Sequence, residues 1–490
     1  MTIRCSSRRS GISCLITCSQ QVSRKCVMGE IAIIGGGIAG LATAFEILER
    51  SPNARVRIYE ASDRLGGNIR TDRVDGYTVE WGPNGFLDNV PETLDLIARL
   101  GISNRLKPAS LASKRRFIWR NGGLHEIKAN PVSFLASDLL SWQGKLRLMA
   151  EPFTGSPPSY DQTVFEFASR HIGAEAARVL VDAMVSGVFA GDSRQLSLQS
   201  AFPKMHAMES QYTSLVRAML GRMRDRRAGR SSGKTGGPSG PAGHLTSFEG
   251  GMSELVDAVA NAVGRKNIVL NTPVSWIAFD RPYGFHIHLK NDEEIDVESV
   301  ILAAPAWNAG PLVDGIAPGI AQTLRKIPRA PLAVVALGWK REAFSYPLNG
   351  FGFLVPRGES LTILGSLWTS SVFPGRADEN HVLMRTMIGG AHCPMELQKT
   401  DEELLATVRA DLGVVFGNLP EPEFERVYRF ENGIPQYTVG HSERVRVVEE
   451  ACARLPGLYV TGNSYHGISV NACVAEAGPL ADRVLAALSG

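Results

Sequence analysis

The hydrophobic pattern of residues 31–60 predicts a strand, a helix and a second strand in direct succession. Four consecutive apolar residues at 31–34 are typical of a buried parallel strand. Apolar side chains then recur at helical spacing, at Ile38, Leu41, Ala42, Phe45 and Leu48. A second short strand follows over 56–59. This order predicts the first unit of an α/β domain with a parallel sheet.

The turn between the first strand and the helix carries the pattern G-x-G-x-x-G, at Gly35, Gly37 and Gly40. The first glycine permits the tight turn, the second lets the backbone approach a pyrophosphate, and the third allows close helix–strand packing. The start of the helix offers free N–H groups to that pyrophosphate. Glu60 ends the second strand, where an acid accepts hydrogen bonds from a ribose hydroxyl. Together these features predict a dinucleotide-binding site.

The pattern of the remaining chain alternates between helical and strand-rich stretches. Amphipathic helices are predicted at 91–100, 131–150 and 163–190, and another helix follows the motif FEGGMSEL and ends at 263. A last helix is predicted from about 471, with a break at Pro479. Strands are predicted at 273–279, 284–289, 300–305 and 458–463, with a β-rich stretch over 329–393. The strand at 300–305 is fully apolar and is expected to be the third parallel partner of the first sheet. The nucleotide domain is therefore predicted to be assembled from distant segments.

Residues 114–124 predict a β-hairpin with Asn121-Gly122 at its turn. Its basic residues allow two interpretations. They form a solvated edge that blocks aggregation, or they bind an anionic substrate, because arginine offers a planar fork to a carboxylate. The spacing alone leaves both open.

Bulk properties exclude few classes of protein. The chain has 490 residues, a formal net charge of +3 and 44% hydrophobic residues, which fits a globular protein of two or three domains and gives no sign of nucleic-acid binding. No uninterrupted apolar stretch is long enough to span a bilayer. The seven cysteines do not predict a disulfide framework or a metal site.

Residues 1–27 are basic and free of acids. They are interpreted either as a wrongly assigned start of the protein, whose true start would be Met28, or as an organellar transit peptide.

The stretch after Glu60 indicates which dinucleotide is bound. Asp63-Arg64-Leu65-Gly66-Gly67 follows at once and resembles the extended signature of the amine-oxidase-like FAD superfamily. In that superfamily the arginine and the glycine pair lie beside the flavin pyrophosphate. FAD is therefore the predicted cofactor.

A narrower resemblance comes from motifs in a fixed order: EASDRLGGNIRT, VEWGPNGF, SGVFAGD, FEGGMSEL, NGFGFLVP, SVFPGRA, PQYTVGH and GNSYHGISVNACV. They resemble the oxygen-dependent porphyrinogen oxidases of haem synthesis, which include protoporphyrinogen oxidase and coproporphyrinogen III oxidase. The resemblance implies a Rossmann-like α/β FAD-binding domain, a β-rich substrate domain and a helical membrane-facing domain. It implies six-electron oxidation of a porphyrinogen, with O2 as acceptor and H2O2 as product.

The resemblance also implies site residues. Positions matching family flavin contacts are Arg64, Gly66, Gly67, Gly82, Asn84, Val274, Gly462, Ile468 and Val470. Positions matching substrate contacts are Arg116 for a propionate and Gly187, Leu354 and Phe373 for the macrocycle. Asn68 and Arg70 match positions near the flavin ring, and Asn68 is the candidate that orients substrate, with a structural role as the alternative.

One departure concerns the last motif, where Ala472 stands in place of the family's usual Asp. It removes a carboxylate near the flavin but leaves the backbone contacts in place.

The alternative functions are an amine oxidase, a carotenoid desaturase, and a flavin-binding scaffold without activity. SGVFAGD and FPGRA argue against the first two.

The predicted domains are an extension at 1–28, an FAD-binding domain of 29–90 with 245–305 and 455–490, a helical domain of 91–220, a flexible loop at 221–244 and a substrate-binding domain of 306–454. Within the helical domain, 131–150 is interpreted either as a core-facing helix or as an amphipathic helix on a membrane surface.

Protoporphyrinogen IX is favoured as substrate over coproporphyrinogen III, whose four propionates call for a more basic pocket. The expected setting is the cytoplasm, on the inner membrane if the helix attaches there, or an organelle if 1–27 is a transit peptide. A homodimer and ferrochelatase are the expected protein partners.

Overall fold

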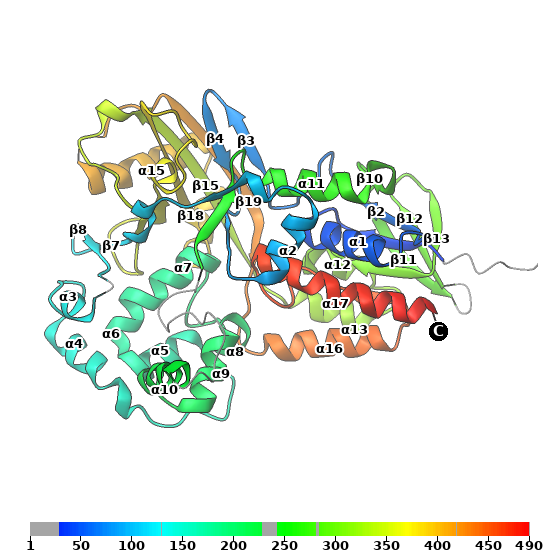
Figure 1. Cartoon of the computed structure of the whole chain (residues 1–490), viewed down its shortest axis with the longest axis horizontal. Coiled ribbons are helices and arrows are strands. Elements are labelled where there is room, and N and C mark those ends of the chain that lie inside the picture. The colour runs from blue at the N-terminus through cyan, green and yellow to red at the C-terminus, as the bar shows by residue number, and fades with distance from the viewer. Residues whose placement is uncertain (1–28, 129, 228–242, 281–283, 418, 490) are drawn as a thin grey trace, which may run out of the picture.

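The computed structural model describes residues 29–128, 130–227, 243–280, 284–417 and 419–489. The extension predicted over 1–28 and most of the loop predicted over 221–244 lie outside the described residues. Figure 1 shows a parallel-sheet domain on the right, a large, mostly antiparallel sheet at the upper left, and a group of helices at the lower left. The α/β prediction is confirmed.

The parallel sheet of the first domain has the strand order β10-β2-β1-β14-β20. Its strands are β1 (Ile31–Ile34), β2 (Val56–Tyr59), β10 (Ile268–Val269), β14 (Ser299–Leu302) and β20 (Leu458–Val460). Every pair in it is parallel, with Ile31 of β1 opposite both Val56 and Ser299. This confirms that distant segments form one domain.

Alternate side chains of β1 point to opposite faces of this sheet. Ile31 and Ile33 pack under α1 (Ile38–Arg50), α11 (Ser253–Val263) and α17 (Val470–Ser489). Ala32 and Ile34 pack with the elements that cover the other face: β11 (Val274–Asp280), β12 (Gly284–Leu289), β13 (Glu294–Val297), α12 (Ala306–Leu312), α13 (Pro318–Arg325) and α16 (His441–Ala453). The four consecutive apolar residues of β1 are therefore explained by burial on both faces.

The second sheet has the order β19-β15-β18-β17-β16-β7-β8, and we call it the substrate sheet. Its strands are β7 (Phe117–Arg120), β8 (Gly123–Glu126), β15 (Arg329–Lys340), β16 (Gly352–Leu354), β17 (Ile363–Leu367), β18 (His381–Gly389) and β19 (Phe424–Pro435). α15 (Asp401–Phe416) covers one face. The predicted hairpin at 114–124 is confirmed as β7 and β8, and it joins this sheet although it lies within the stretch predicted to be a helical domain.

The third region consists of helices and short turns. Its elements are α3 (Pro131–Leu135), α4 (Trp142–Met149), η3 (Glu151–Phe153), α5 (Val164–Ile172), α6 (Ala174–Ala176), η4 (Ala177–Asp182), α7 (Ala183–Phe189), α8 (Leu198–Ala201), α9 (Pro203–Tyr212) and α10 (Leu215–Arg227). His171 lies at its centre, with Nδ1 2.8 Å from Glu151 Oε1 and Nε2 3.0 Å from Glu209 Oε1. Glu151 also accepts hydrogen bonds from Leu215 N–H and Val216 N–H, so one buried carboxylate caps the start of α10.

Shorter elements connect these regions. They are β3 (Thr71–Val74), β4 (Tyr77–Glu80), β5 (Phe86–Leu87), α2 (Pro91–Arg99), β6 (Leu106–Pro108), β9 (Leu245–Phe248) and α14 (Thr369–Val372). β3 and β4 form a two-stranded hairpin, and β5, β9 and β6 form a small sheet in that order.

The β-rich stretch predicted over 329–393 is confirmed by β15, β16, β17 and β18, with the short helix α14 among them. Two sequence predictions of local structure were wrong. Residues 221–227 belong to α10, because the cap from Glu151 starts a helix whose later residues are polar. α17 continues through Pro479, because Leu480 and Val484 beyond it are fully buried. Burying two such side chains stabilises by about 3–6 kcal/mol, which offsets the roughly 3 kcal/mol cost of a proline inside a helix.

A buried ion pair joins the parallel domain to the substrate sheet. Arg376 Nη2 lies 3.0 Å from Glu80 Oε1, and the two side chains are 2% and 0% exposed. The same carboxylate accepts hydrogen bonds from Met252 N–H and from Thr71 Oγ1, while Arg376 also donates to Ser247 Oγ. One carboxylate therefore holds β3, β4, the start of α11 and the turn after α14 together.

We expect Arg376→Leu to lower the free energy of unfolding by about 3–5 kcal/mol, because Glu80 keeps its burial and loses its cation. Urea unfolding followed by circular dichroism measures the change. Adding Glu80→Gln should recover part of the loss, and Arg325→Leu, which removes the exposed pair with Asp314, should barely move the midpoint. An Arg376→Leu midpoint equal to the wild-type midpoint would contradict this role.

Candidate functional site

The first glycine turn leaves an open space in front of α1. A Cβ added at Gly40 would lie 2.2 Å from the Gly35 carbonyl oxygen, so close packing excludes any side chain there. Gly35 has φ +113°, which favours glycine. A Cβ added at Gly37 would meet no atom within 4 Å. The space before Gly37, at the positive end of α1, is therefore free to hold a pyrophosphate.

The second glycine turn lies directly against the first. Gly66 N–H donates to the Gly36 carbonyl oxygen at 2.9 Å, and Gly37 and Gly66 form a β-bridge. Arg64 fixes this turn by donating to the carbonyl oxygen of Gly67 at 2.7 Å. Burial, together with the charge of Arg70, lowers the pKa of Arg64. The two turns thus form one cradle of backbone N–H groups with an arginine beside it.

Glu60 lies at the edge of this cradle. Its Oε2 accepts a hydrogen bond from Gly36 N–H at 2.7 Å, and its Oε1 accepts one from Ser62 N–H at 2.9 Å. Oε1 also lies 2.8 Å from the Ser62 hydroxyl, which donates to it, whereas Oε2 has a further lone pair. Glu60 therefore orders the glycine turn and retains acceptor capacity for a ribose hydroxyl.

The third part of the cradle comes from the C-terminal segment. Gly462 follows β20 with φ +112°, and α17 begins at Val470, which is buried against α1 and α11. Ile468 packs beside Val185 and Phe189 of α7. Val274 opens β11, two residues after Thr272, whose N–H donates to the Glu60 carbonyl oxygen. These predicted cofactor positions converge on the carboxyl ends of β1, β2 and β20.

Tyr437 supports the 462–468 loop, and sequence analysis did not identify it. Its hydroxyl donates to the Asn463 carbonyl oxygen and accepts from Gly467 N–H, each at 2.7 Å. His441 stacks on the tyrosine ring with centroids 4.0 Å apart. Burial lowers the pKa of His441 to about 4, so the stacked ring is neutral at neutral pH. Both residues lie in the motif PQYTVGH, which was the available sequence signal for a role of this segment.

Arg385 positions a second loop, and it was also missed. It donates to the carbonyl oxygens of Gly82 at 2.8 Å and Trp81 at 3.2 Å, and to Asn84 Oδ1 at 3.4 Å. Burial lowers the pKa of Arg385 to about 10, so it stays protonated at neutral pH. A Cβ added at Gly82 would lie 2.1 Å from the Asn68 carbonyl oxygen, so this loop packs on the second glycine turn.

The two predicted catalytic residues lie beside this loop. Asn68 is exposed, and its Nδ2 lies 3.4 Å from the Gly433 carbonyl oxygen at the end of β19. The Arg70 guanidinium carbon lies 3.6 Å from the centroid of Trp81, whose ring lies 4.4 Å from that of Tyr428 on β19. Asn68 and Arg70 thus lie where the FAD-binding domain meets the substrate sheet.

The predicted substrate residues divide into two groups. Leu354 and Gly187 are in contact, since a Cβ added at Gly187 would lie 2.6 Å from Leu354 Cδ2. Leu354 pairs with Ile118 of β7, which places Arg116, two residues before it, on the same face of the substrate sheet. Phe373 instead lies in the interior, 1% exposed.

A cross-strand row extends this face toward the FAD-binding domain. It runs through Leu354, Gly365, Met387, Val334 and Tyr428 on five neighbouring strands. Leu354 and Met387 are half-buried, so they present apolar surface along the row. We call the row and the face around it the substrate slot. Met387 had no signal in the sequence, because its position depends on strand pairing.

Arg116 is the free cation at one end of this slot. Its guanidinium carbon lies 5.1 Å from the Phe351 ring, and none of the carboxylates in the described ranges forms an ion pair with it. Burial lowers its pKa. The neighbouring Arg115, by contrast, pairs with Glu126 at 3.0 Å. An arginine without a counter-ion beside an apolar face can bind a carboxylate of an apolar ligand.

Other kinds of site find little support in the described residues. Among them, no group of three His, Cys, Asp or Glu side chains could hold a metal ion. The part of the chain that the structure describes also contains no helix long and apolar enough to cross a membrane.

Comparisons with known proteins agree with this geometry. The family model for flavin-containing amine oxidoreductases matches residues 38–485. Coproporphyrinogen III oxidase of Bacillus subtilis (strain 168) is 30% identical over 459 residues, which cover 91% of this chain and 95% of the relative. Chloroplastic protoporphyrinogen oxidase of Nicotiana tabacum is 30% identical over 476 residues, which cover 94% and 86%. A crystal structure from Exiguobacterium sp. 255-15, provisionally assigned as protoporphyrinogen oxidase, matches with a TM-score of 0.81 and 26% identity over 94% of this chain and 99% of that chain.

Tyr437→Phe should weaken FAD binding about fivefold, because the loop at 462–468 loses two hydrogen bonds worth roughly 1 kcal/mol together after reorganisation. Flavin fluorescence on titration of the apoprotein measures the dissociation constant. Tyr459→Phe is the matched control, since Tyr459 lies on β20 and its hydroxyl does not bond to this loop. Equal FAD affinity in wild type and Tyr437→Phe would contradict the role assigned to Tyr437.

Proposed function

Because the chain belongs to the flavin-containing amine oxidoreductase family, and within it to the porphyrinogen oxidases, we propose that it uses FAD to oxidise a porphyrinogen to a porphyrin with O2 as acceptor. The observation that carries this proposal is the substrate slot: an apolar row with Leu354 and Met387 half-buried, beside an arginine without a counter-ion. A porphyrinogen combines a large apolar macrocycle with carboxylate side chains, so it needs both features.

The residues around the slot have separate tasks in this proposal. Arg116 binds a propionate and fixes the orientation of the macrocycle. Leu354 and Met387 contact the ring and exclude water from it. Asn68, at the boundary with the FAD-binding domain, orients the substrate through its amide or stabilises the charge that develops on the ring as hydride leaves. Arg70 is held by the Trp81 ring and by Asp72, so its charge has a fixed place near the same boundary.

Bound FAD supplies the two-electron acceptor, which O2 regenerates with release of H2O2 three times for each porphyrin formed. The chain's own contribution is the cradle that holds it. Gly37, Gly67 and the start of α1 would hold the pyrophosphate, Glu60 would hold a ribose, and the start of α17 would supply positive potential near the flavin ring.

Two substrates can undergo this same oxidation. Protoporphyrinogen IX is the candidate that the sequence favours, because its vinyl groups and two propionates suit an apolar slot with one arginine. Coproporphyrinogen III is the second candidate, because a pocket lined by three arginines lies beside the slot. The product of either reaction belongs to haem synthesis.

We also propose a membrane surface as a partner of the third region. Trp142, Leu146 and Met149 lie on one side of α4 at helical spacing and are 68%, 53% and 52% exposed, and Phe153 of η3 continues the stripe at 85%. Other residues of 131–150, among them Leu139 and Leu148, pack in a buried cluster, so the stretch has both a core-facing and an exposed apolar side. Apolar side chains presented in this way, with Lys145 between them, suit the headgroup region of a bilayer.

An aerobic assay with both porphyrinogens, read by porphyrin fluorescence and peroxide, tests the main proposal. Arg116→Ala should lower kcat/KM about 10- to 100-fold, mostly through KM, because it removes a charge-assisted hydrogen bond made in the ground state. Arg115→Ala is the neighbouring control and should leave kcat/KM within about twofold. No oxidation of either porphyrinogen by protein with full FAD content would overturn the proposal.

Cosedimentation with vesicles of phosphatidylethanolamine and phosphatidylglycerol tests the membrane proposal. Trp142→Ser combined with Leu146→Ser should reduce binding at least about tenfold, because two apolar side chains no longer enter the lipid. Val414→Ser, which changes an exposed apolar residue of α15 that is 59% exposed, should have no effect. Equal binding by all three proteins would show that the α4 stripe does not contact lipid.

A further inference from the structure

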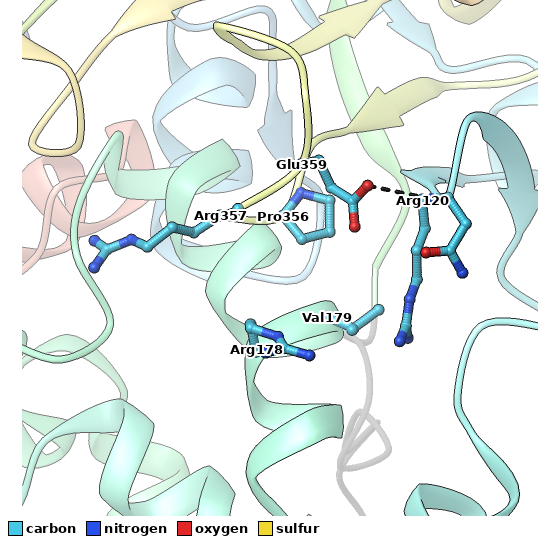
Figure 2. Close-up of a pocket in the computed structure, with 8 residues that line it drawn as sticks. Arg120, Arg178, Val179, Pro356, Arg357 and Glu359 are labelled. Atoms are coloured by element: carbon cyan, nitrogen blue, oxygen red, sulfur yellow. Dashed lines mark hydrogen bonds between the residues drawn. The ribbon is translucent and has the colours of Figure 1, made fainter.

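A pocket of about 210 Å³ lies at the open edge of the substrate sheet (Figure 2). Its walls come from the β7–β8 turn, from η4 and from the loop after β16. The lining residues are Arg120, Asn121, Arg178, Val179, Pro356, Arg357, Gly358 and Glu359. Most of the pocket's surface is polar, and three of the four charged side chains are arginines.

Arg178 is the arginine in this pocket without a partner. Arg120 pairs with Glu175 at 2.8 Å, and Arg357 pairs with Asp192 at 2.9 Å. No ion pair or side-chain hydrogen bond of Arg178 occurs within the described ranges, and its side chain is exposed. Figure 2 shows Arg178 extending toward the side of the pocket on which Arg120 lies, while Arg357 points away from both.

The one carboxylate in the pocket is already engaged. Glu359 Oε2 accepts a hydrogen bond from Asn121 N–H at 3.2 Å, and Glu359 forms no ion pair with the arginines that line the pocket. An anion that enters between Arg120 and Arg178 meets two cations, and Glu359 on the other wall limits its affinity by repulsion.

The register of the strands places this pocket at the Leu354 end of the slot, on the other side of Leu354 from Arg116 along the strand direction. Along β7, Arg116, Ile118 and Arg120 share one face. Pro356 follows Leu354 by two residues along the neighbouring parallel strand, and Val179 packs with Ile118. Arg116 and Arg120 are separated by four residues, or about 13 Å along the strand. The apolar surface of Leu354 and Ile118 therefore has an arginine on each side along the strand direction.

This arrangement discriminates between the two substrates. Protoporphyrinogen IX carries both propionates on one edge of the macrocycle, which Arg116 alone can bind. Coproporphyrinogen III carries a propionate on each of its four pyrroles, so carboxylates project from both edges. On the basis of the proposed function, we propose that the pocket is a second carboxylate subsite, with Arg178 as the binding residue, and that it directs the enzyme to a tetracarboxylate porphyrinogen.

Arg178→Gln tests the subsite by comparing kcat/KM for the two porphyrinogens. For coproporphyrinogen III we expect a fall of about 10- to 100-fold, since one charge-assisted hydrogen bond is lost. For protoporphyrinogen IX the value should stay within about twofold. Glu359→Gln should act in the opposite direction and raise kcat/KM for coproporphyrinogen III. Arg265→Gln, a change of an exposed arginine in the FAD-binding domain, should alter neither value.

Binding of the oxidised product, coproporphyrin III, to the holoenzyme provides a readout without turnover. Quenching of porphyrin fluorescence should give a dissociation constant that Arg178→Gln weakens about as much as it lowers kcat/KM. Oxidation of both porphyrinogens with no selective effect of Arg178→Gln would overturn the subsite and leave the proposed function intact. Arg178-dependent binding of coproporphyrin III without oxidation of either porphyrinogen would overturn the proposed function and support the subsite. Neither oxidation nor binding would overturn both.

Discussion

The buried pair of Glu80 and Arg376 is the constraint on which the rest of the molecule depends. A carboxylate and a guanidinium removed from water stabilise a fold only if each finds further hydrogen bonds. Glu80 finds them at Met252 and Thr71, and Arg376 finds one at Ser247. These partners belong to the FAD-binding domain and its connecting strands, so satisfying one ion pair fixes how that domain lies against the substrate sheet.

The geometry of the site follows from that docking. Arg385 is on the substrate sheet, yet it bonds to the loop at 81–84, which packs on the second glycine turn. Trp81 of the same loop lies between Arg70 and Tyr428. The apolar row of the slot ends at Tyr428, so cofactor cradle and substrate slot meet along a line of buried contacts. A shift of the sheet would leave the charge of Arg385 without acceptors, which the low-dielectric interior penalises.

The sequence predicted what is local. Residues 31–67 carry strand, turn, helix and glycine pair within one short segment, so spacing alone identified the cradle, and the ordered motifs identified the family. Arg385 and Tyr437 escaped because their partners lie far away in the chain, at 81–84 and 463–467. The stretch that contains α4 kept two interpretations because periodicity gives the apolar side of a helix and not what covers it. Pro479 suggested a break, but burial of the residues beyond it prevailed.

The order of assembly in the cell follows from the strand order of the parallel sheet. β1 and β2 are adjacent in sequence, but β14 and β20 complete the sheet from residues near 300 and 460. The cradle needs the loop after β20, so a nascent chain on the ribosome exposes its glycine turns long before it can retain the cofactor. Loop closure over such separations is slow and leaves apolar strands unpaired during synthesis. The cradle can therefore retain FAD only after β20 and the loop behind it have joined the sheet.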